Sequence, residues 1–345
     1  MRKIIITVLF FGLITISAFS QNIVEIPFKS LGKDYVELVN SIKEIKNLEI
    51  KQIISLDDSG FEKFNDLDTR YLMFFKLSIH YAALKEYDKC FEILKKGHSE
   101  GFFFLFNYDG NYPSYLEELK KFDGYQALVD QNESLKKEKE STGKAEYMIQ
   151  LPEDYNENIK YPLMLIMHGG GGCIPDLQYL YNSPKLKNDF IVAYFQGSDM
   201  LGSYHRAFSR NWIEQVTTGF NQIISKCSVD TTKIILAGPS SGGVRSIHLA
   251  YKNEIPARGL LLNFPVIPGI IKNTTYLEFK ERDLKVVQLC GENDWAIQQQ
   301  KEFAYWLDRY MIKNRFVVFP EIGHGFPANF QHHLETSIEY LLEDK

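Results

Sequence analysis

The spacing of hydrophobic residues divides the chain into two halves with different predicted folds. Between about residues 30 and 140, hydrophobic residues recur every three or four positions, as on amphipathic helices. The clearest such segment is 71–96, whose stripe is interrupted by Lys85 and Glu86 and consists of Leu77, Tyr81, Leu84, Tyr87, Phe91 and Leu94. Because two helices packed as a hairpin bury a stripe of this kind, we expect a small all-α domain here.

After residue 144, short hydrophobic runs alternate with helical patterns. We expect strands at residues 146–151, 161–167, 190–195, 233–237, 258–263, 285–290 and 316–319, and helices at 210–226, 243–253, 297–311 and 330–342. Several of the strands are continuous hydrophobic runs, which is typical of strands buried on both faces of a parallel sheet. The predicted fold class is therefore α/β, a three-layer domain with a mostly parallel sheet, preceded by the all-α domain.

The first twenty residues have the layout of a secretory signal peptide. Arg2 and Lys3 supply positive charge, residues 4–16 are almost all hydrophobic, and Ala18 and Ser20 are small residues at the positions that a signal peptidase reads. We predict cleavage after Ser20 and a periplasmic or secreted protein; an uncleaved anchor helix is the alternative, for which the run is short. The predicted organisation is a signal peptide at 1–20, a helical domain at 21–140 and an α/β domain at 141–345.

Composition narrows the classes of partner and cofactor. The formal net charge is −5, which does not favour a nucleic-acid partner or an anionic membrane surface, and no second long hydrophobic stretch predicts a stable membrane anchor. The four cysteines, Cys90, Cys173, Cys227 and Cys290, match no disulfide framework and form no CxxC zinc motif. We expect buried free thiols, with a disulfide at Cys173 as the open alternative, and neither a metal nor an organic cofactor.

The central motif is a Gly-x-Ser-x-Gly sequence from Gly238 to Gly242, centred on Ser240. It follows a predicted strand and precedes a predicted helix, which is the context of a nucleophile elbow. The serine of such a turn has strained dihedral angles, so the residues two positions away must be small. Ser240 rather than Ser241 is the predicted nucleophile, because only Ser240 has a glycine two positions away on each side. The alternative is a glycine-rich loop without a catalytic role.

A second glycine-rich motif, His168 to Gly172, follows the predicted strand at 161–167. Backbone N–H groups in such a loop can bind the oxyanion that develops during acyl transfer. We expect one donor from Ser241, directly after the nucleophile, and another from Gly170 or Gly171. The loop lacks the Lys-Ser/Thr ending of a phosphate-binding P-loop. His168 is predicted to hold the loop by hydrogen bonds rather than to act in catalysis.

Candidates for the acid and the base follow Ser240 along the chain. Asp294 comes just after the predicted strand at 285–290, where a carboxylate can reach a histidine and fix its tautomer. Glu292 is the weaker alternative, and an Asn-Asp turn without a catalytic role is another. His324 follows the last predicted strand and has glycine on both sides, whereas the other three histidines after Ser240 lie in helical patterns. The order Ser, Asp, His is that of α/β-hydrolases.

Four segments carry a resemblance to a known family: LPEDYNENIKYPLMLIMHGGGG, IILAGPSSGG, LCGENDW and IGHGFP, in that order. On these, residues 145–345 resemble an α/β-hydrolase of the polyhydroxybutyrate-depolymerase, feruloyl-esterase and esterase-D-like group. The resemblance implies a serine esterase that acts through an acyl-enzyme, with Ser240, Asp294 and His324 as its triad. Pro239 departs from the family, in which His, Phe or Tyr is commoner. The segment LSIHYAALKEYDKCFEILKKG is similar to a single tetratricopeptide-like hairpin.

The substrate is predicted only by class. A small-molecule or glycan ester is expected, including acyl groups on polysaccharides, with substrate contacts assigned to Tyr204, Trp212 and Trp295; Tyr204 and Trp212 equally suit packing of the loop at 198–211. The alternatives are a prolyl-oligopeptidase-like peptidase, which the short chain disfavours, and a non-catalytic binding protein, which an intact triad disfavours. For the helical half, we predict a fixed interface with the α/β domain that buries residues 102–106; a tethered module that binds a protein partner is the rival.

Overall fold

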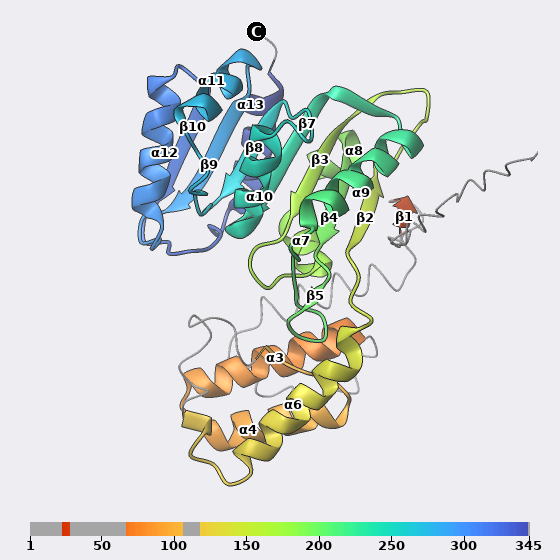
Figure 1. The fold of residues 1–345 in the computed structure, drawn as a ribbon, viewed down its shortest axis with the longest axis vertical. Helices are drawn as coiled ribbons and strands as arrows, with labels where there is room; N and C mark the ends of the chain where they lie inside the picture. Colours follow the sequence, from red (N-terminus) through yellow and green to blue (C-terminus); the bar gives the residue numbers. More distant parts are fainter. Residues whose placement is uncertain (1–22, 28–66, 106–117, 344–345) are drawn as a thin grey trace, which may run out of the picture.

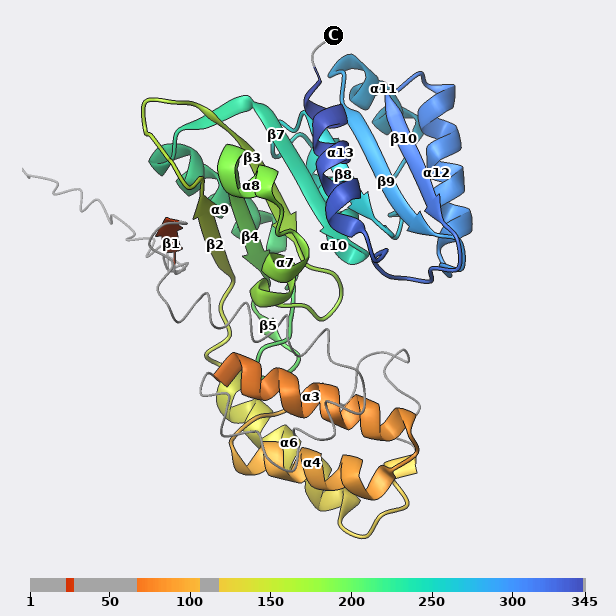
Figure 2. The ribbon, with the colours of Figure 1, turned by 180° about the vertical axis from the view of Figure 1, so that it is seen from behind.

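The computed structural model describes residues 23–27, 67–105 and 118–343 of the chain (Figure 1). The predicted signal peptide, residues 1–20, and Phe106 lie outside the described residues. The described elements form an α/β unit and a smaller helical unit, which lies at one end of the sheet in both Figure 1 and Figure 2. Among the described residues, no helix is long and hydrophobic enough to span a bilayer.

The predicted fold class is confirmed: the α/β unit is a mostly parallel sheet covered by helices on both faces. Its described strands have the order β1-β2-β4-β3-β7-β8-β9-β10, and among them the only antiparallel pairing joins β2 to β4. Its strands are β1 (Ile23–Pro27), β2 (Glu146–Leu151), β3 (Tyr161–Met167), β4 (Ile191–Gln196), β7 (Val229–Pro239), β8 (Gly259–Asn263), β9 (Lys285–Gly291) and β10 (Asn314–Phe319). A two-stranded hairpin, β5 (Asp199–Met200) with β6 (Arg206–Ala207), lies in a loop outside it.

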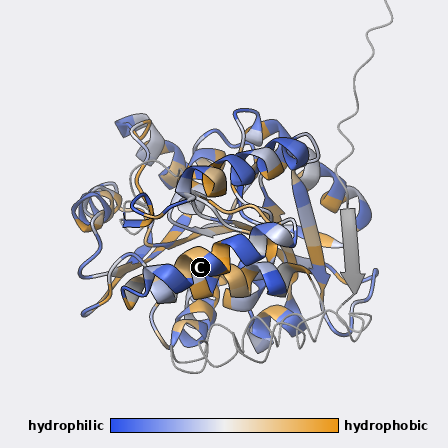
Figure 3. Cartoon of the chain, turned by 90° about the horizontal axis from the view of Figure 1, so that it is seen from below, coloured by the Kyte–Doolittle hydropathy of each residue, from blue (hydrophilic) through white to orange (hydrophobic). Residues whose placement is uncertain are grey.

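Alternate residues of each central strand face two separate hydrophobic cores, which is why these strands are hydrophobic throughout. In β3, Leu163 and Leu165 pack in one core, whereas Met164 and Ile166 pack in the other. The first core is covered by α9 (Trp212–Lys226), α10 (Ser241–Tyr251), α11 (Asn273–Glu281) and α12 (Ile297–Arg309). The second is covered by α7 (Ile174–Leu180), α8 (Pro184–Asp189) and α13 (Phe330–Leu342). Hydrophobic and hydrophilic residues are interspersed along the helices that flank the sheet (Figure 3).

The helical unit consists of α3 (Leu67–Ala83), α4 (Tyr87–Ser99) and α6 (Tyr125–Glu140). The predicted hairpin is present, because α3 and α4 are joined by a short turn and share a buried core with α6. Leu84 differs from the expectation: it lies in that turn and is 43% exposed, since the positive φ of Lys85 reverses the chain there. The Asn132 side chain of α6 hydrogen-bonds the backbone N–H and carbonyl of Phe104, which ties the chain after α4 to α6.

The helical unit is joined to the α/β unit by a buried interface. The Tyr71 hydroxyl of α3 and the His205 Nδ1 lie 2.8 Å apart, in hydrogen-bonding contact. The Phe103 N–H donates to the Ser203 hydroxyl, and the Ser203 N–H donates back to the Phe103 carbonyl, both at 2.9 Å. Residues 102–105 are all buried, as predicted for this hydrophobic run. The loop between β5 and β6 is therefore the part of the α/β unit that holds the helical unit.

One strand and three short helices differ from what the sequence predicts. β1 lies in the segment predicted to be helical, yet it pairs in parallel with β2 and belongs to the main sheet. β1 stands at the end of the strand order and pairs with one strand only, as an edge strand does. The short helices α7, α8 and α11 were not expected, because fewer than ten residues show little helical periodicity.

All four cysteines are buried free thiols, as expected, and no disulfide forms at Cys173. Burial raises the pKa of the Cys90 thiol to about 12 and raises that of Cys290 as well. A thiol with a raised pKa is a poor nucleophile at neutral pH, because little of it is ionised. Cys90 and Cys290 therefore act as small core residues.

Candidate active site

The Gly-x-Ser-x-Gly motif forms a sharp turn between β7 and α10. Ser240 has φ 51° and ψ −118°, a conformation that costs free energy for a residue with a Cβ atom. The flanking glycines allow the turn to form: a Cβ atom on Gly242 would lie 2.1 Å from the carbonyl oxygen of Met167, and one on Gly238 would lie 2.4 Å from the same atom. The predicted steric reason for the two glycines is therefore present in the structure.

The structure brings the predicted nucleophile, acid and base into one hydrogen-bonded chain. The Nε2 atom of His324 lies 2.9 Å from the Ser240 hydroxyl oxygen. The Nδ1 atom of His324 lies 2.9 Å from Asp294 Oδ1. When the Nδ1–H of His324 donates its hydrogen bond to Asp294, Nε2 is left without a proton and can accept the serine proton. The arrangement can therefore remove the hydroxyl proton of Ser240.

Asp294 is buried and has two donors besides His324. The Ala296 N–H donates to Oδ1 and the Gln300 side-chain amide donates to Oδ2, each at 2.9 Å. Hydrogen bonds from several donors offset part of the cost of burying a carboxylate. The alternative acid, Glu292, is exposed, and its side chain instead accepts a hydrogen bond from the N–H of Glu321.

The glycine-rich loop lies next to Ser240 and is held by His168. A Cβ atom placed on Gly169 would lie 3.5 Å from the Ser240 Cβ. The His168 Nε2 accepts a hydrogen bond from the Gly197 N–H, so its Nδ1 carries the proton and donates to the Gly169 carbonyl. Burial lowers the pKa of His168 to about 3, so the ring is neutral at physiological pH. His168 thus holds the loop, the role expected for it.

The candidate oxyanion donors lie on both sides of the nucleophile. Gly170 and Gly171 line the same cavity as Ser240, and neither N–H has a hydrogen-bond acceptor among the described residues. Ser241 is the first residue of α10, where backbone N–H groups are not used within the helix. The next glycine, Gly172, is instead paired with Arg206 through two backbone hydrogen bonds. The N–H groups of Gly170 and Gly171 are therefore candidates for binding a carbonyl at Ser240.

A cavity of about 360 Å³ opens above the serine. Its lining includes the glycine-rich loop, Leu177 and Leu180 of α7, and Phe264 and Phe326. Two further lining residues, Leu72 and Lys76, come from α3 of the helical unit. The cavity is therefore built by both units of the protein.

The three aromatic residues predicted to contact substrate lie outside this lining. Tyr204 is partly buried and packs against the core of the helical unit, where its ring is 5.4 Å from that of Tyr71. Trp212 is partly buried against α10, 5.5 Å from the His248 ring. Trp295 is 65% exposed and its ring lies 5.2 Å from that of His324. The structure thus brings only Trp295 close to the hydrogen-bonded chain.

Sequence reasoning missed Gln300 and most of the side chains that line the cavity, including Leu72 and Lys76. Gln300 is one of three consecutive glutamines, which carry no signal that one of them binds Asp294. Leu72 and Lys76 lie in the predicted hairpin, and only the position of α3 against the α/β unit brings them to the cavity. The one sequence signal for Lys76 was that it is a charged residue within the hydrophobic run of α3.

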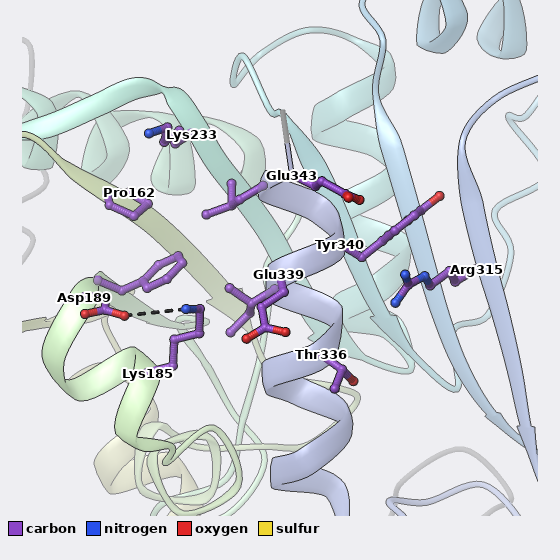
Figure 4. A pocket seen from close by; sticks show the side chains of 12 residues that line it. Pro162, Lys185, Asp189, Lys233, Arg315, Thr336, Glu339, Tyr340 and Glu343 are labelled. Atoms are coloured by element: carbon purple, nitrogen blue, oxygen red, sulfur yellow. Dashed lines mark ion pairs between the residues drawn. The ribbon is translucent and has the colours of Figure 1, made fainter. Parts of the chain in front are cut away.

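A second cavity, of about 590 Å³, lies between α8 and α13, toward the ends of the sheet where β3 and β10 begin (Figure 4). Its lining mixes charges of both signs, and Lys185 and Asp189 there are 3.6 Å apart. It contains none of the residues of the Ser-His-Asp chain. Within the described part of the chain, no group of three or more His, Cys, Asp or Glu side chains is arranged to hold a metal ion.

Comparison with known proteins supports the fold and does not extend to activity. No protein-family model and no curated protein sequence matches the chain. An uncharacterized protein from Bacillus cereus ATCC 10987 is similar in structure, with a TM-score of 0.51 and 18% identity, over 89% of this chain and 98% of that one.

Two enzymes are more distant structural neighbours. Esterase Est2 of Thermogutta terrifontis, bound to butyrate, has a TM-score of 0.41 and 15% identity over 58% of this chain and 89% of its own. The S-formylglutathione hydrolase FrmB of Staphylococcus aureus has a TM-score of 0.41 and 13% identity over 56% of this chain and 89% of its own. At these values, neither says anything about what this chain does.

Proposed function

We propose that this protein is a serine hydrolase that cleaves carboxylic esters through an acyl-enzyme. The observation that carries the proposal is the continuous hydrogen-bonded chain from the Ser240 hydroxyl through His324 to the buried Asp294, with 2.9 Å at each step. Ser240 lies at a strained strand–helix turn beside a glycine-rich loop, and the backbone N–H groups there are candidates for the oxyanion donors that acyl transfer requires. A protein that only binds ligands has no use for this combination.

In the proposed mechanism, the Ser240 oxygen attacks the ester carbonyl while His324 Nε2 takes the hydroxyl proton. The N–H of Ser241 and that of Gly170 or Gly171 stabilise the oxyanion of the tetrahedral intermediate. Collapse expels the alcohol, which receives the proton from His324, and leaves an acyl-enzyme. A water molecule, deprotonated by His324, then attacks the acyl carbonyl, and His324 returns the proton to the Ser240 oxygen as the bond to the acid breaks. Asp294 orients the imidazole and stabilises its positive charge throughout.

We propose that the substrate is a glycan with ester-linked acyl groups or a small-molecule ester. The cavity of about 360 Å³ is large enough for a short acyl or aryl group and falls within the usual range of ligand sites. The exposed ring of Trp295 beside His324 provides a surface on which a sugar can stack. A periplasmic or secreted location, proposed from the first twenty residues, suits a polymeric substrate that lies outside the cytoplasm.

The proposal is tested with a fluorophosphonate probe and a substrate panel. The wild type should be labelled at Ser240 and should hydrolyse short p-nitrophenyl esters or acetylated and feruloylated glycans. Ser240→Ala and His324→Ala should lower kcat by several orders of magnitude with little change in melting temperature, and Asp294→Asn by somewhat less. Normal esterase activity in Ser240→Ala would refute the assignment, and cleavage of peptides but not esters would favour a peptidase.

A further inference from the structure

A further cavity, of about 390 Å³, lies between α11, α12 and the loop that follows β8. Both helices lie at the end of the sheet that is formed by β9 and β10 (Figure 1). The loop contributes Ile267 and Pro268 to the lining, α11 contributes Tyr276, and α12 contributes Gln299 and Trp306. This distal cavity shares no lining residue with the catalytic cavity, and the proposed mechanism does not use it.

Aromatic rings form one wall of the distal cavity. The ring centroids of Tyr276 and Trp306 are 6.3 Å apart, with 31° between the ring planes. The Tyr276 ring also stacks on that of Tyr310, at 5.1 Å and 14°, which holds it in place. Flat rings of this kind offer a hydrophobic face for the C–H groups of a sugar ring.

Polar groups without partners lie beside this aromatic wall. Tyr276 is only 5% exposed, yet its hydroxyl has no hydrogen-bond partner within the described part of the chain. The side-chain amides of Asn273 and Gln299, which also line the cavity, likewise make no hydrogen bond to a described residue. A buried polar group without a partner costs free energy, and a ligand that supplies hydroxyl groups recovers it.

The charges on the lining do not favour an ionic ligand. Among the described lining residues, the charged side chains are Lys272 and Glu302, one of each sign. Burial, and after it the nearby Glu302 carboxylate, raise the pKa of Tyr276 to about 12, so its hydroxyl keeps its proton and can donate it to a ligand. Aromatic rings, neutral polar groups and balanced charges together suit a neutral ligand rich in hydroxyl groups.

Two segments of the chain run from the catalytic site to the distal cavity. Phe264 lines the catalytic cavity and Ile267 lines the distal one, so their Cα atoms are at most about 11 Å apart. The ring of Trp295 lies 5.2 Å from that of His324, and Gln299, four residues further on, lines the distal cavity. A chain of sugar units can therefore extend from one cavity to the other.

We propose that the distal cavity binds sugar units of a neutral glycan chain that carries its ester-linked acyl group at Ser240. Tyr276 and Trp306 stack on the sugar, and Gln299 hydrogen-bonds its hydroxyl groups. The inference rests on the proposed ester hydrolysis and narrows the substrates to esters on an oligosaccharide or polysaccharide. The distal cavity takes no part in the chemical steps; it favours long glycan substrates over short ones.

A binding measurement tests the distal cavity without turnover. In the full-length Ser240→Ala protein, calorimetry measures the affinities for xylohexaose, cellohexaose and mannohexaose. At least one of them should bind; adding Trp306→Ala should weaken that binding about tenfold, and Trp306→Tyr should retain most of it. Because Trp306 also packs against the core, Gln299→Ala at an exposed position is the second variant and should weaken binding about threefold. Tyr305→Ala is the matched control, since Tyr305 is an exposed aromatic residue of α12 outside the lining.

Kinetics separate this inference from the proposed function. The substrates are p-nitrophenyl acetate and the acetylated form of the hexasaccharide that binds. Trp306→Ala should lower the ratio of kcat/KM for the hexasaccharide to that for p-nitrophenyl acetate about tenfold, chiefly through KM, and Tyr305→Ala should not change it. If the wild type hydrolyses no ester but hexasaccharide binding depends on Trp306 and Gln299, the ester proposal alone fails. If no hexasaccharide binds, or if Trp306→Ala and Gln299→Ala both leave the affinity unchanged, the glycan site is refuted.

Discussion

Gln300 allows a strong test of how the site is positioned, because its side chain binds the acid of the Ser-His-Asp chain without lining the substrate cavity. Its amide donates to Asp294 Oδ2 at 2.9 Å and to the Pro265 carbonyl at 3.0 Å, and the side chain is fully buried. The substitution Gln300→Leu keeps a similar volume and removes both donors. Asp294 then retains only the two hydrogen bonds on its Oδ1 atom.

The magnitude follows from the two lost hydrogen bonds. A hydrogen bond to a charged group is worth about 1.5–3 kcal/mol, and a buried carbonyl without a partner costs about 1–3 kcal/mol. Part of this is offset, because Gln300 Oε1 has no partner among the described residues and is removed as well. We expect the free energy of unfolding to fall by about 2–4 kcal/mol and the melting temperature by about 4–12 °C. We expect kcat to fall about tenfold to a hundredfold, less than for loss of the acid itself.

Thermal unfolding and ester hydrolysis measure these two effects. KM should change little, since Gln300 does not line the cavity. Gln298→Leu is the matched control, because Gln298 is exposed on the same turn of α12 and should leave both kcat and melting temperature near the wild-type values. If Gln300→Leu behaves like Gln298→Leu, the hydrogen bond to Asp294 does not position the acid and the reasoning is wrong.

Four further predictions follow from the sequence and the structure. Ser241→Ala should reduce kcat only mildly in an ester assay, because the backbone N–H remains; a loss as large as that of Ser240→Ala would contradict this. The pKa of about 3 of His168 lies below its unfolded value of about 6.5, so protons bind preferentially to the unfolded chain between these values. Stability should therefore fall with decreasing pH across this window, by up to about 1.4 kcal/mol per unit in denaturant titrations, and His168→Asn should flatten the dependence. A fragment that begins at Ser141 loses the α3 wall and its buried interface; it should aggregate or lose activity, whereas a soluble, fully active fragment would favour a tethered module. Mass spectrometry of the protein from its native host should find Gln21 at the amino terminus, and an intact Met1 would reject cleavage at this site.

The elements that could be predicted from the sequence are those whose requirements are local. The bounds of β2, β3 and α13 agree with the expectation, because their hydrophobic patterns are long and are bounded by polar residues or turns. The Gly238–Gly242 turn was also predictable, since the clash that excludes a Cβ atom depends on a strand–turn–helix connection within a few residues. Local sterics and periodicity are both visible in a single sequence.

The features that could not be predicted depend on tertiary placement. The antiparallel direction of β2 is a property of its pairing with β4, and no residue within β2 encodes it. Gln300 was indistinguishable from its two neighbours until the rotation of α12 placed one of the three against Asp294. Tyr204 was predicted as a substrate contact because it is an aromatic residue in a loop near the site. Its ring instead packs against the core of the helical unit, next to Tyr71.

The position of β1 has a consequence for how this protein is made. β1 precedes the helical unit in the chain, but its partner β2 follows that unit, with residues 28–145 between the two strands. At about 5–20 residues per second, β2 leaves the ribosome on the order of ten seconds after β1. The contacts between α3 and α4 are close in sequence and can form during this interval, whereas the edge of the sheet cannot close. If the chain is exported, this delay favours translocation, because the sheet stays open while the amino-terminal part is still threading through the membrane.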